Sequence, residues 1–468
     1  MAAQCIAPLI AVEAFPHDRF LPQVEIASDG ARMCELFRQY LRPYNGNIYD
    51  IQECTLTRIR HRHAARCILQ YNLRLIDADT GRKRIQWVTG TIYPENRSEH
   101  IWHKLRAADL RQEISSALRT FEPVSFIPEL KMLVQLFPFD RRLPALPLCM
   151  RDPSAEIESL LLARFGPGNW QTESWNVEPI RYRAGLAVVL RYTVQASDKA
   201  TRRREKRRFY AKIYRDEKGG EIYDVLKALW ERDNVSGGHF KVARPIAYLS
   251  DLHALIQEEA SGISLQEILL RGQAHEAESV ARRVARTLAA LHLDRISTTR
   301  HHPVQDEVAV LEKIRKTLQW ASPHLKEELY AIVNDILRSL EGVPLRPTHL
   351  DLKTDHILLD NNHCTLLDLD SFALADPVLD AAHILAQIVG LKFRPAASHE
   401  RLRMAAGAFT EEYFNHVPGG WRRRLPSLYA GAALKVALGF FRRQEPEWPE
   451  RVRVMVAEAK DSLAGKVW

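Results

Sequence analysis

Two stretches of this chain resemble each other at a fixed spacing, and this repeat constrains the fold more than any other feature. They read IRHRHAARCILQYNLRL, from Ile59, and IRYRAGLAVVLRYTVQA, from Ile180. Tyr71 aligns with Tyr192 at a spacing of 121 residues, and the same spacing aligns Thr91 with Lys212. Self-similarity at a constant offset is typical of a duplicated structural unit. We therefore expect one small unit to occur twice in the first half of the chain.

Each copy has the pattern of a small β-sheet. A strand, a turn, a second strand, a basic loop and a third strand follow one another, because the apolar residues alternate or occur in β-rich groups. A helical stretch and a further apolar strand come next, LKMLVQLF from Leu130 in one copy and LHALIQEE from Leu252 in the other. The basic loops read TGRKR, from Thr80, and TRRREKRR, from Thr201.

The net charge of +8 is poor evidence for a nucleic-acid partner. Part of the positive charge lies in these two loops, at corresponding positions of the repeat. Such runs are typical of solvated hairpin loops. We therefore expect no nucleic-acid partner.

The rest of the composition points to a cytoplasmic globular protein. Hydrophobic residues make up 46% of the chain and charged residues 26%, which excludes disorder over the whole length. The six cysteines form no C-x-x-C pair, which favours a reducing compartment. No run of apolar residues is long enough to span a membrane, and the N-terminal segment lacks the basic start of a secretory signal. The sequence leaves the oligomeric state open.

The second half becomes helical and then carries an acidic hairpin. Two short β-rich pieces, His356–Leu359 and Cys364–Leu367, flank a polar turn. Asp351 precedes the first piece, whereas Asp368 and Asp370 follow the second. Carboxylates at the edge of one hairpin suit phosphoryl transfer, which needs a carboxylate near the attacking hydroxyl and oxygen ligands for Mg²⁺.

The spacing around Asp351 strengthens this interpretation. His349, Asp351 and Leu352 fit the kinase catalytic-loop pattern H-x-D-L-x-x-x-N, but His356 stands where the pattern has Asn. Asp368, 17 residues after Asp351, ends an apolar strand at the place of the metal-binding carboxylate.

These motifs together resemble the aminoglycoside phosphotransferase/choline kinase family. Residues 375–382, ADPVLDAA, are similar to its G-D-P-x-x-D-L-A segment, and Leu288–His292 is similar to its L-x-x-L-H helix end. Protein kinases would instead carry D-F-G and A-P-E after the second strand, and neither tripeptide occurs there. The resemblance covers about residues 175–391. It implies an α+β, protein-kinase-like bilobal fold, with a β-rich N-lobe and a helical C-lobe.

The resemblance and the repeat together predict how the chain is divided. An extra β-rich, N-lobe-like domain would precede the kinase-like part. The expected parts are an N-terminal segment, a degenerate N-lobe-like domain, the kinase-like N-lobe and the helical C-lobe with the catalytic loop, at residues 1–45, 46–150, 151–261 and 262–468. The first copy carries Thr91 in place of Lys212, so we expect a structural, regulatory or partner-binding role for it. The alternative is an unrelated β-rich domain whose similarity to the second copy is accidental.

The resemblance also implies site residues for ATP and for catalysis. Asp351 would accept or orient the proton of the substrate hydroxyl, and Lys353 is the second catalytic candidate. Lys212 would pair with the nucleotide phosphates, with Glu221 on the next helix as its acidic partner and Asp224 and Glu231 as the alternatives. The hinge between the lobes would hold adenine through its backbone, near Gln257 and Glu259. The expected substrate is a small molecule with a hydroxyl group.

A metal site completes these expectations. Asp368 and His356 are the predicted ligands of Mg²⁺ or Mn²⁺, and Asp370 would assist them at the metal. Imidazole is a ligand that Mg²⁺ seldom chooses. His356 therefore leaves three alternatives open, namely altered metal geometry, a preference for Mn²⁺, or the loss of transfer activity.

The remaining polar residues of this region are assigned to structure. Asp376 is interpreted as a brace for the catalytic loop, and His349 and Asp380 as hydrogen-bonding residues within the lobe.

Three hypotheses for the function follow. The leading one is an ATP-dependent phosphotransferase acting on a small alcohol. The second is a catalytically weak or inactive nucleotide-binding or scaffold protein, favoured by His356 and by the single glycine of Arg183-Ala184-Gly185-Leu186. The third, a protein kinase, is disfavoured by the Asp376-Pro377-x-x-Asp380 pattern.

Overall fold

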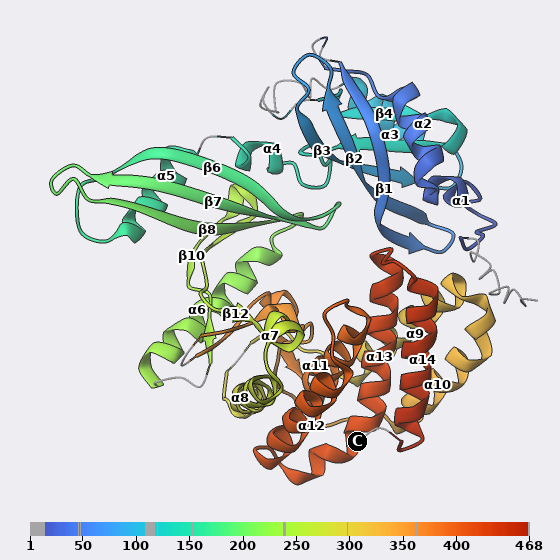
Figure 1. The fold of residues 1–468 in the computed structure, drawn as a ribbon, viewed down its shortest axis with the longest axis vertical. Coiled ribbons are helices and arrows are strands. Elements are labelled where there is room, and N and C mark those ends of the chain that lie inside the picture. The colour runs from blue at the N-terminus through green and yellow to red at the C-terminus, as the bar shows by residue number, and fades with distance from the viewer. Residues whose placement is uncertain are drawn as a thin grey trace, which may run out of the picture.

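The computed structural model of the protein describes residues 15–44, 46, 48–107, 118, 120–151, 153–236, 240–296, 298–360 and 363–466. Two five-stranded antiparallel sheets lie on one side of a helical lobe (Figure 1). The chain therefore has an α+β, protein-kinase-like fold, as the sequence predicts. Within the described ranges, no helix is both long and apolar enough to cross a membrane.

The first sheet has the strand order β1-β2-β3-β5-β4 and packs against two short helices near the N-terminus. Its core includes Phe37 and Tyr71, whose rings meet edge to face at 5.3 Å. The elements of this part are α1 (Gln23–Ser28), α2 (Gly30–Tyr40), β1 (Tyr49–Arg62), β2 (Arg66–Asp77), β3 (Lys83–Ile92), α3 (Arg97–Ala107), β4 (Val124–Ile127) and β5 (Met132–Leu136).

The second sheet repeats this topology, with the order β10-β11-β8-β7-β6. Its strands β6, β7 and β8 correspond to β1, β2 and β3, and its helix α6 follows β8 as α3 follows β3. The elements are α4 (Leu146–Cys149), α5 (Ala155–Leu162), β6 (Trp170–Arg183), β7 (Ala187–Asp198), β8 (Arg204–Tyr214), α6 (Lys218–Ser236), β9 (Lys241–Val242), β10 (Pro245–Leu249) and β11 (Ala254–Glu258).

Corresponding turns of the two sheets use the same chemistry. The side chain of Asp77 accepts the backbone N–H of Thr80, and that of Asp198 accepts the N–H of Thr201. Such turns at the end of a strand are typical of aspartate, which hydrogen-bonds to backbone groups two or three residues further on. The shared topology and turns account for the constant spacing of the sequence repeat.

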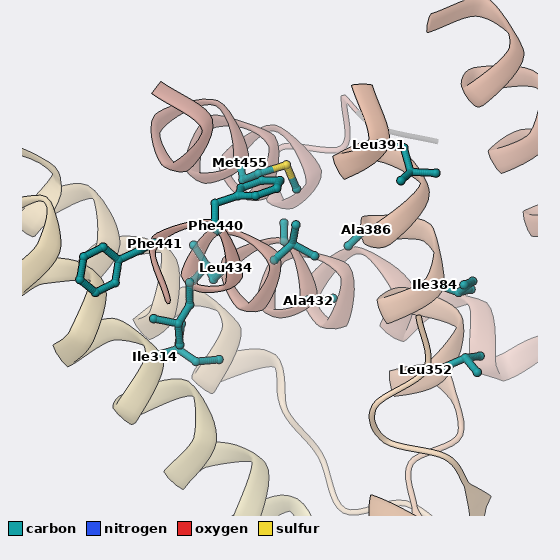
Figure 2. Packing of buried hydrophobic residues seen from close by; sticks show 14 of the residues in the cluster. Ile314, Leu352, Ile384, Ala386, Leu391, Ala432, Leu434, Phe440, Phe441 and Met455 are labelled. Atoms are coloured by element: carbon teal, nitrogen blue, oxygen red, sulfur yellow. The ribbon is translucent and has the colours of Figure 1, made fainter. Parts of the chain in front are cut away.

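The helical lobe contains α7 to α14 and several very short strands. Its apolar core lies between α9, α11, α13 and α14, where Ile314, Ala386, Leu434 and Met455 are buried (Figure 2). The elements are β12 (Ile263–Ser264), α7 (Leu265–Arg271), α8 (Ala274–Leu293), α9 (Val304–Ala321), α10 (Lys326–Ser339), β13 (Arg346–Thr348), β14 (Ile357–Leu359), β15 (Cys364–Leu366), β16 (Ala373–Ala375), α11 (Val378–Gly390), α12 (His399–Asn415), α13 (Leu425–Arg442) and α14 (Trp448–Leu463).

The first sheet contacts the helical lobe through aromatic stacking. The ring of His61 on β1 stacks on Trp320 of α9, with centroids 3.7 Å apart and planes 11° apart. His61 also pairs with the buried carboxylate of Asp18 at 2.5 Å, and the Trp320 indole donates to the His17 carbonyl at 3.1 Å. Figure 1 shows β1 reaching down to α13, which it contacts.

The same sheet also contacts the second one. The N–H of Gly185 and the hydroxyl of Tyr182, both in the β6–β7 hairpin, donate to the Asp140 carboxylate at 2.6 and 2.9 Å. The guanidinium of Arg60 donates to the Ala184 carbonyl at 2.8 Å. The first sheet is therefore in contact with both parts of the kinase-like fold.

Candidate active site

The loop before β14 is held in place by one buried carboxylate. Asp380, in the first turn of α11, is fully buried and accepts the backbone N–H groups of His349 and Leu350 at 2.6 and 2.7 Å. Although burial opposes it, hydrogen bonds from His292 and from the His349 N–H lower the pKa of Asp380. An ionised carboxylate that accepts several hydrogen bonds is a strong anchor for a loop. The expectation that His349 and Asp380 are hydrogen-bonding residues of the lobe agrees with this geometry.

Asp351 follows this anchor and faces two lysines. Its carboxylate lies 2.6 Å from Nζ of Lys353 and 3.9 Å from Nζ of Lys435. Although burial opposes it, these two ammonium groups lower the pKa of Asp351, which is therefore ionised at neutral pH. The structure thus brings the two predicted catalytic residues into direct contact.

Lys435 is a site residue that the sequence reasoning missed. It belongs to α13, and its ammonium also donates to the Leu350 carbonyl at 2.9 Å. It is the single charged residue of the otherwise apolar stretch LYAGAALKVALGFF, from Leu428. A lone lysine in a buried helix was the available signal, because a buried charge needs a partner.

The side chain of Lys212, on β8 of the second sheet, contacts the acidic hairpin. Its Nζ lies 2.5 Å from Asp368 and 2.7 Å from Asp370, and the hydroxyl of Tyr214 donates to Asp370 at 2.9 Å. Although burial opposes it, the two carboxylates raise the pKa of Lys212. The ammonium therefore stays charged between two aspartates.

His356 presents an unpaired nitrogen to Asp368. Its Nδ1 lies 3.1 Å from the Asp351 carbonyl, which can only accept, so Nδ1 carries the proton. Burial lowers the pKa of His356 to about 4, and the ring is neutral at pH 7. Its Nε2 is buried with no hydrogen-bond partner among the described residues, 3.6 Å from an Asp368 oxygen.

A lone pair that faces a carboxylate in this way fits a bound cation. Nitrogen and oxygen donors together suit Mn²⁺ better than Mg²⁺. Among the described residues, no group of three or more His, Cys, Asp or Glu side chains is arranged to hold a metal. His356 and Asp368 can therefore supply two ligands, and phosphate oxygens and water would have to supply the others.

The structure does not bring Glu221 to Lys212. Glu221 is exposed on α6, and within the described chain the ionic partners of Lys212 are Asp368 and Asp370. The predicted ion pair is therefore absent, because the two aspartates after β15 lie within direct reach of the ammonium.

The predicted hinge residues lie at the end of β11, an inner strand of the second sheet, and just beyond it. Gln257 on β11 faces Tyr210 in the antiparallel register, and Glu259 lies 3.5 Å from Arg208. A cavity of about 490 Å³ adjoins this end of the strand. Its lining residues are Lys206, Arg207, Arg208, Phe209, Glu258 and Glu259.

Asp376 has a different role from the one predicted. Its carboxylate accepts two hydrogen bonds from Arg424, at 2.8 and 2.9 Å, and so joins the loop after β16 to the start of α13. Asp380, rather than Asp376, binds the backbone of the catalytic loop. The reason is position, because Asp380 lies on the turn of α11 that faces that loop.

A β-sheet lobe that carries Lys212 and a helical lobe that carries Asp351 and Asp368 define the protein-kinase-like class. A family model described as the phosphotransferase enzyme family matches residues 191–424, which is half of the chain. The chain belongs to this family. No curated protein matches the sequence significantly.

Several solved structures are similar at low identity. An ethanolamine kinase from Plasmodium vivax is 13% identical, with 63% of this chain and 85% of that chain covered and a TM-score of 0.39. A choline kinase from Cryptosporidium parvum is 12% identical, with coverage of 62% and 89% and a TM-score of 0.41. APH(2")-IIia, in complex with GDP and kanamycin, is 14% identical, with coverage of 66% and 99% and a TM-score of 0.42.

Proposed function

We propose that the protein is an ATP-dependent phosphotransferase that moves the γ-phosphate of ATP to a hydroxyl group of a small molecule. Membership of the phosphotransferase family supports this proposal. The single observation that carries it is the ionised carboxylate of Asp351, held next to Lys353 and Lys435 in the same site as Lys212 and Asp368.

Each residue of the site would have its own role in the transfer of the phosphoryl group. Asp351 accepts a hydrogen bond from the acceptor hydroxyl and orients its oxygen toward the γ-phosphorus. An O–P bond forms to the acceptor while the bond to the ADP oxygen breaks, and the hydroxyl proton leaves toward Asp351. Because most of the catalysis in phosphoryl transfer comes from positioning and charge, a strongly ionised carboxylate suits this task better than a strong base.

Lys212 would exchange its carboxylate partners for nucleotide phosphates. An ammonium already held between two aspartates lies where phosphate charge needs compensation. Asp368 and His356 would hold a divalent cation, which supplies positive charge at the phosphate oxygens when bound. Adenine would pair with the backbone near Gln257 and Glu259.

ATP consumption tests this function. The purified chain is incubated with ATP and a panel of small alcohols, with Mg²⁺ and Mn²⁺ in parallel. Asp351→Asn should lower the rate about 10²- to 10⁴-fold, as expected for the loss of a positioned acid–base group, while ATP binding is retained. Asp335→Asn, an exposed aspartate of α10, is the matched control and should leave the rate unchanged. Failure of the wild-type chain to bind ATP would disprove the proposal.

A second candidate function is nucleotide binding without transfer. It is favoured by the histidine in place of the usual asparagine and by the two carboxylates that already neutralise Lys212. It predicts that ATP stabilises the wild-type chain although no acceptor and neither metal supports turnover. The same panel of alcohols separates the two functions.

A further inference from the structure

The last part of β1 carries a row of arginines. Arg58, Arg60 and Arg62 alternate with Ile59 and His61, and side chains two residues apart in a strand point to the same face. Ile59 and His61 are buried on the other face. A register shift between Leu56 and Arg58 starts the row. One face of β1 therefore carries three cations where the first sheet meets the rest of the protein.

The corresponding strand of the second sheet carries the same feature. Arg181 and Arg183 on β6 stand at the repeat positions of Arg60 and Arg62, again two residues apart. Arg181 lies 3.8 Å from the carboxylate of Asp368, so this row begins at the candidate active site. The bond from Arg60 to the Ala184 carbonyl holds the two strands next to each other.

The helical lobe adds further positive charge at the same junction. β1 contacts α13, whose last residue is Arg442, and the His61–Trp320 stack places β1 against α9, which carries Lys313. Burial and the neighbouring arginines lower the pKa of Arg58 to about 9. Burial, with Arg183 nearby, lowers the pKa of Arg442 to about 10. Both guanidinium groups nevertheless remain charged at neutral pH.

Apart from Asp368, which lies beside Arg181, the nearby carboxylates of the described chain have other partners. Asp18 is paired with His61, Asp140 accepts hydrogen bonds from the β6–β7 hairpin, and Glu445 is paired with Arg443. Within the described chain, the side chains of Arg58 and Arg183 have no hydrogen bond or ion pair, and neither has that of Arg442. Cations held together without counter-ions destabilise the empty protein, and an anion that binds among them removes that cost.

We propose that this junction recognises the acceptor through a phosphate group, so that the substrate is a phosphorylated small alcohol. The inference rests on the proposed function and narrows its substrate class. Arginine suits a phosphate dianion because its planar fork of donors can bind two phosphate oxygens at once. Because the row starts beside Asp368, a sugar-sized molecule anchored there can direct a free hydroxyl toward Asp351. Cationic acceptors such as choline or aminoglycosides would be repelled by the same charges.

The proposal gives the first sheet a role in catalysis. The kinase-like part alone supplies Arg181, Arg183, Arg442 and Lys313, whereas Arg58 and Arg60 come from the preceding unit. That unit has no lysine at the position of Lys212, so it contributes to acceptor recognition rather than to nucleotide binding.

Binding without nucleotide tests the inference directly. The melting temperature is measured with glucose 6-phosphate and with neutral glucose, both for the full wild-type chain and for a triple variant. In the triple variant, Arg58, Arg183 and Arg442 are each changed to Gln. Glucose 6-phosphate should stabilise the wild-type chain, glucose should not, and the triple variant should bind the phosphate ester at least about tenfold more weakly. Arg403→Gln, an exposed arginine on α12, is the control and should behave as the wild type.

The melting temperature of the unliganded protein provides a second readout. If the three arginines had only a structural role, their substitution would lower this temperature instead of raising it. Because the substitutions remove like charges, the unliganded triple variant should melt at a higher temperature than the wild type. A lower melting temperature, together with unchanged stabilisation by glucose 6-phosphate in the single variant Arg183→Gln, would overturn the inference. So would a loss of ATP-induced stabilisation in the triple variant, or stronger stabilisation of the wild type by a 20-base-pair RNA duplex than by the sugar phosphate.

The two proposals fail separately. If the chain transfers phosphate to neutral alcohols but does not bind glucose 6-phosphate, the proposed function stands and this inference is overturned. A chain that binds the sugar phosphate through the arginines but never consumes ATP supports phosphate recognition and contradicts the phosphotransferase.

Discussion

The ammonium of Lys212 and the carboxylate of Asp368 lie 2.5 Å apart although 156 residues separate them in the sequence. This pair joins β8 of the second sheet to the hairpin that carries the predicted metal ligands. Both groups are largely buried, with 16% and 19% of the side chains exposed. Each of the two groups therefore compensates the charge of the other.

Removal of this lysine should damage both stability and function. Lys212→Met leaves two buried carboxylates without their cation, so the free energy of unfolding should fall by about 3 kcal/mol. The transfer rate should fall at least about 100-fold, because the phosphates lose their ammonium partner. Denaturant unfolding and ATP titration measure the two effects. Lys227→Met, an exposed lysine on α6, is the control, and an unchanged ATP affinity in Lys212→Met would contradict the assigned role.

Substitution of the unusual histidine should change the metal preference. His356→Asn replaces a neutral imidazole by the hard amide oxygen that Mg²⁺ prefers. We expect the ratio of the rate with Mg²⁺ to the rate with Mn²⁺ to rise at least about tenfold. His363→Asn makes the same change in the turn of the same hairpin and should leave the ratio unaltered. An identical ratio in His356→Asn and the wild type would mean that His356 is not a metal ligand.

The buried anchor of the catalytic loop should be essential to stability. Asp380→Asn places an amide N–H₂ group among backbone donors and removes a buried charge that is hydrogen-bonded to His292, so stability should fall by about 3 kcal/mol. The pKa of Asp380 is lowered in the folded chain, so its contribution is present above the ordinary carboxyl range and is lost as the pH falls below it. The stability difference between wild type and variant should therefore shrink below about pH 4. A difference that grows on acidification would contradict this assignment.

The contact between the first sheet and the helical lobe should depend on one tryptophan. Trp320→Ala removes the stack on His61, the hydrogen bond to the His17 carbonyl and the edge-to-face contact with Phe441. We expect the free energy of unfolding to fall by about 3 kcal/mol and the backbone amides of β1 to exchange hydrogen faster. Trp102→Ala, on α3 of the same unit but away from this contact, should leave the exchange in β1 unchanged. Unaltered exchange in Trp320→Ala would show that the contact contributes little.

Much of the fold could be predicted because local patterns recur. The 121-residue spacing, the alternating strands and the turn aspartates Asp77 and Asp198 are all local features, and they correspond to two sheets with one topology. The expectation of an α+β, protein-kinase-like fold and of the phosphotransferase family is confirmed. The proposed domain boundaries and the individual site roles stay predictions.

The partners of the site residues could not be predicted in the same way. Lys212 lies opposite two aspartates that follow β15, so Glu221 on the adjacent helix has no part in the pair. The hydrogen bond between Lys435 and the Leu350 carbonyl could not be predicted either, because the two residues are 85 positions apart in the sequence. Such pairings depend on how lobes pack, and periodicity carries no information about packing across the chain.

By itself, then, the sequence determined that a small sheet occurs twice, that a catalytic-loop motif follows, and which copy carries the lysine. Only the tertiary structure decided that Arg181 of β6 lies beside Asp368, and that Arg58, Arg183 and Arg442 have no carboxylate partner in the described part of the chain. The physical reason is that alternation sets which face of a strand a side chain occupies, whereas the charges that lie opposite that face come from elements far away in the sequence.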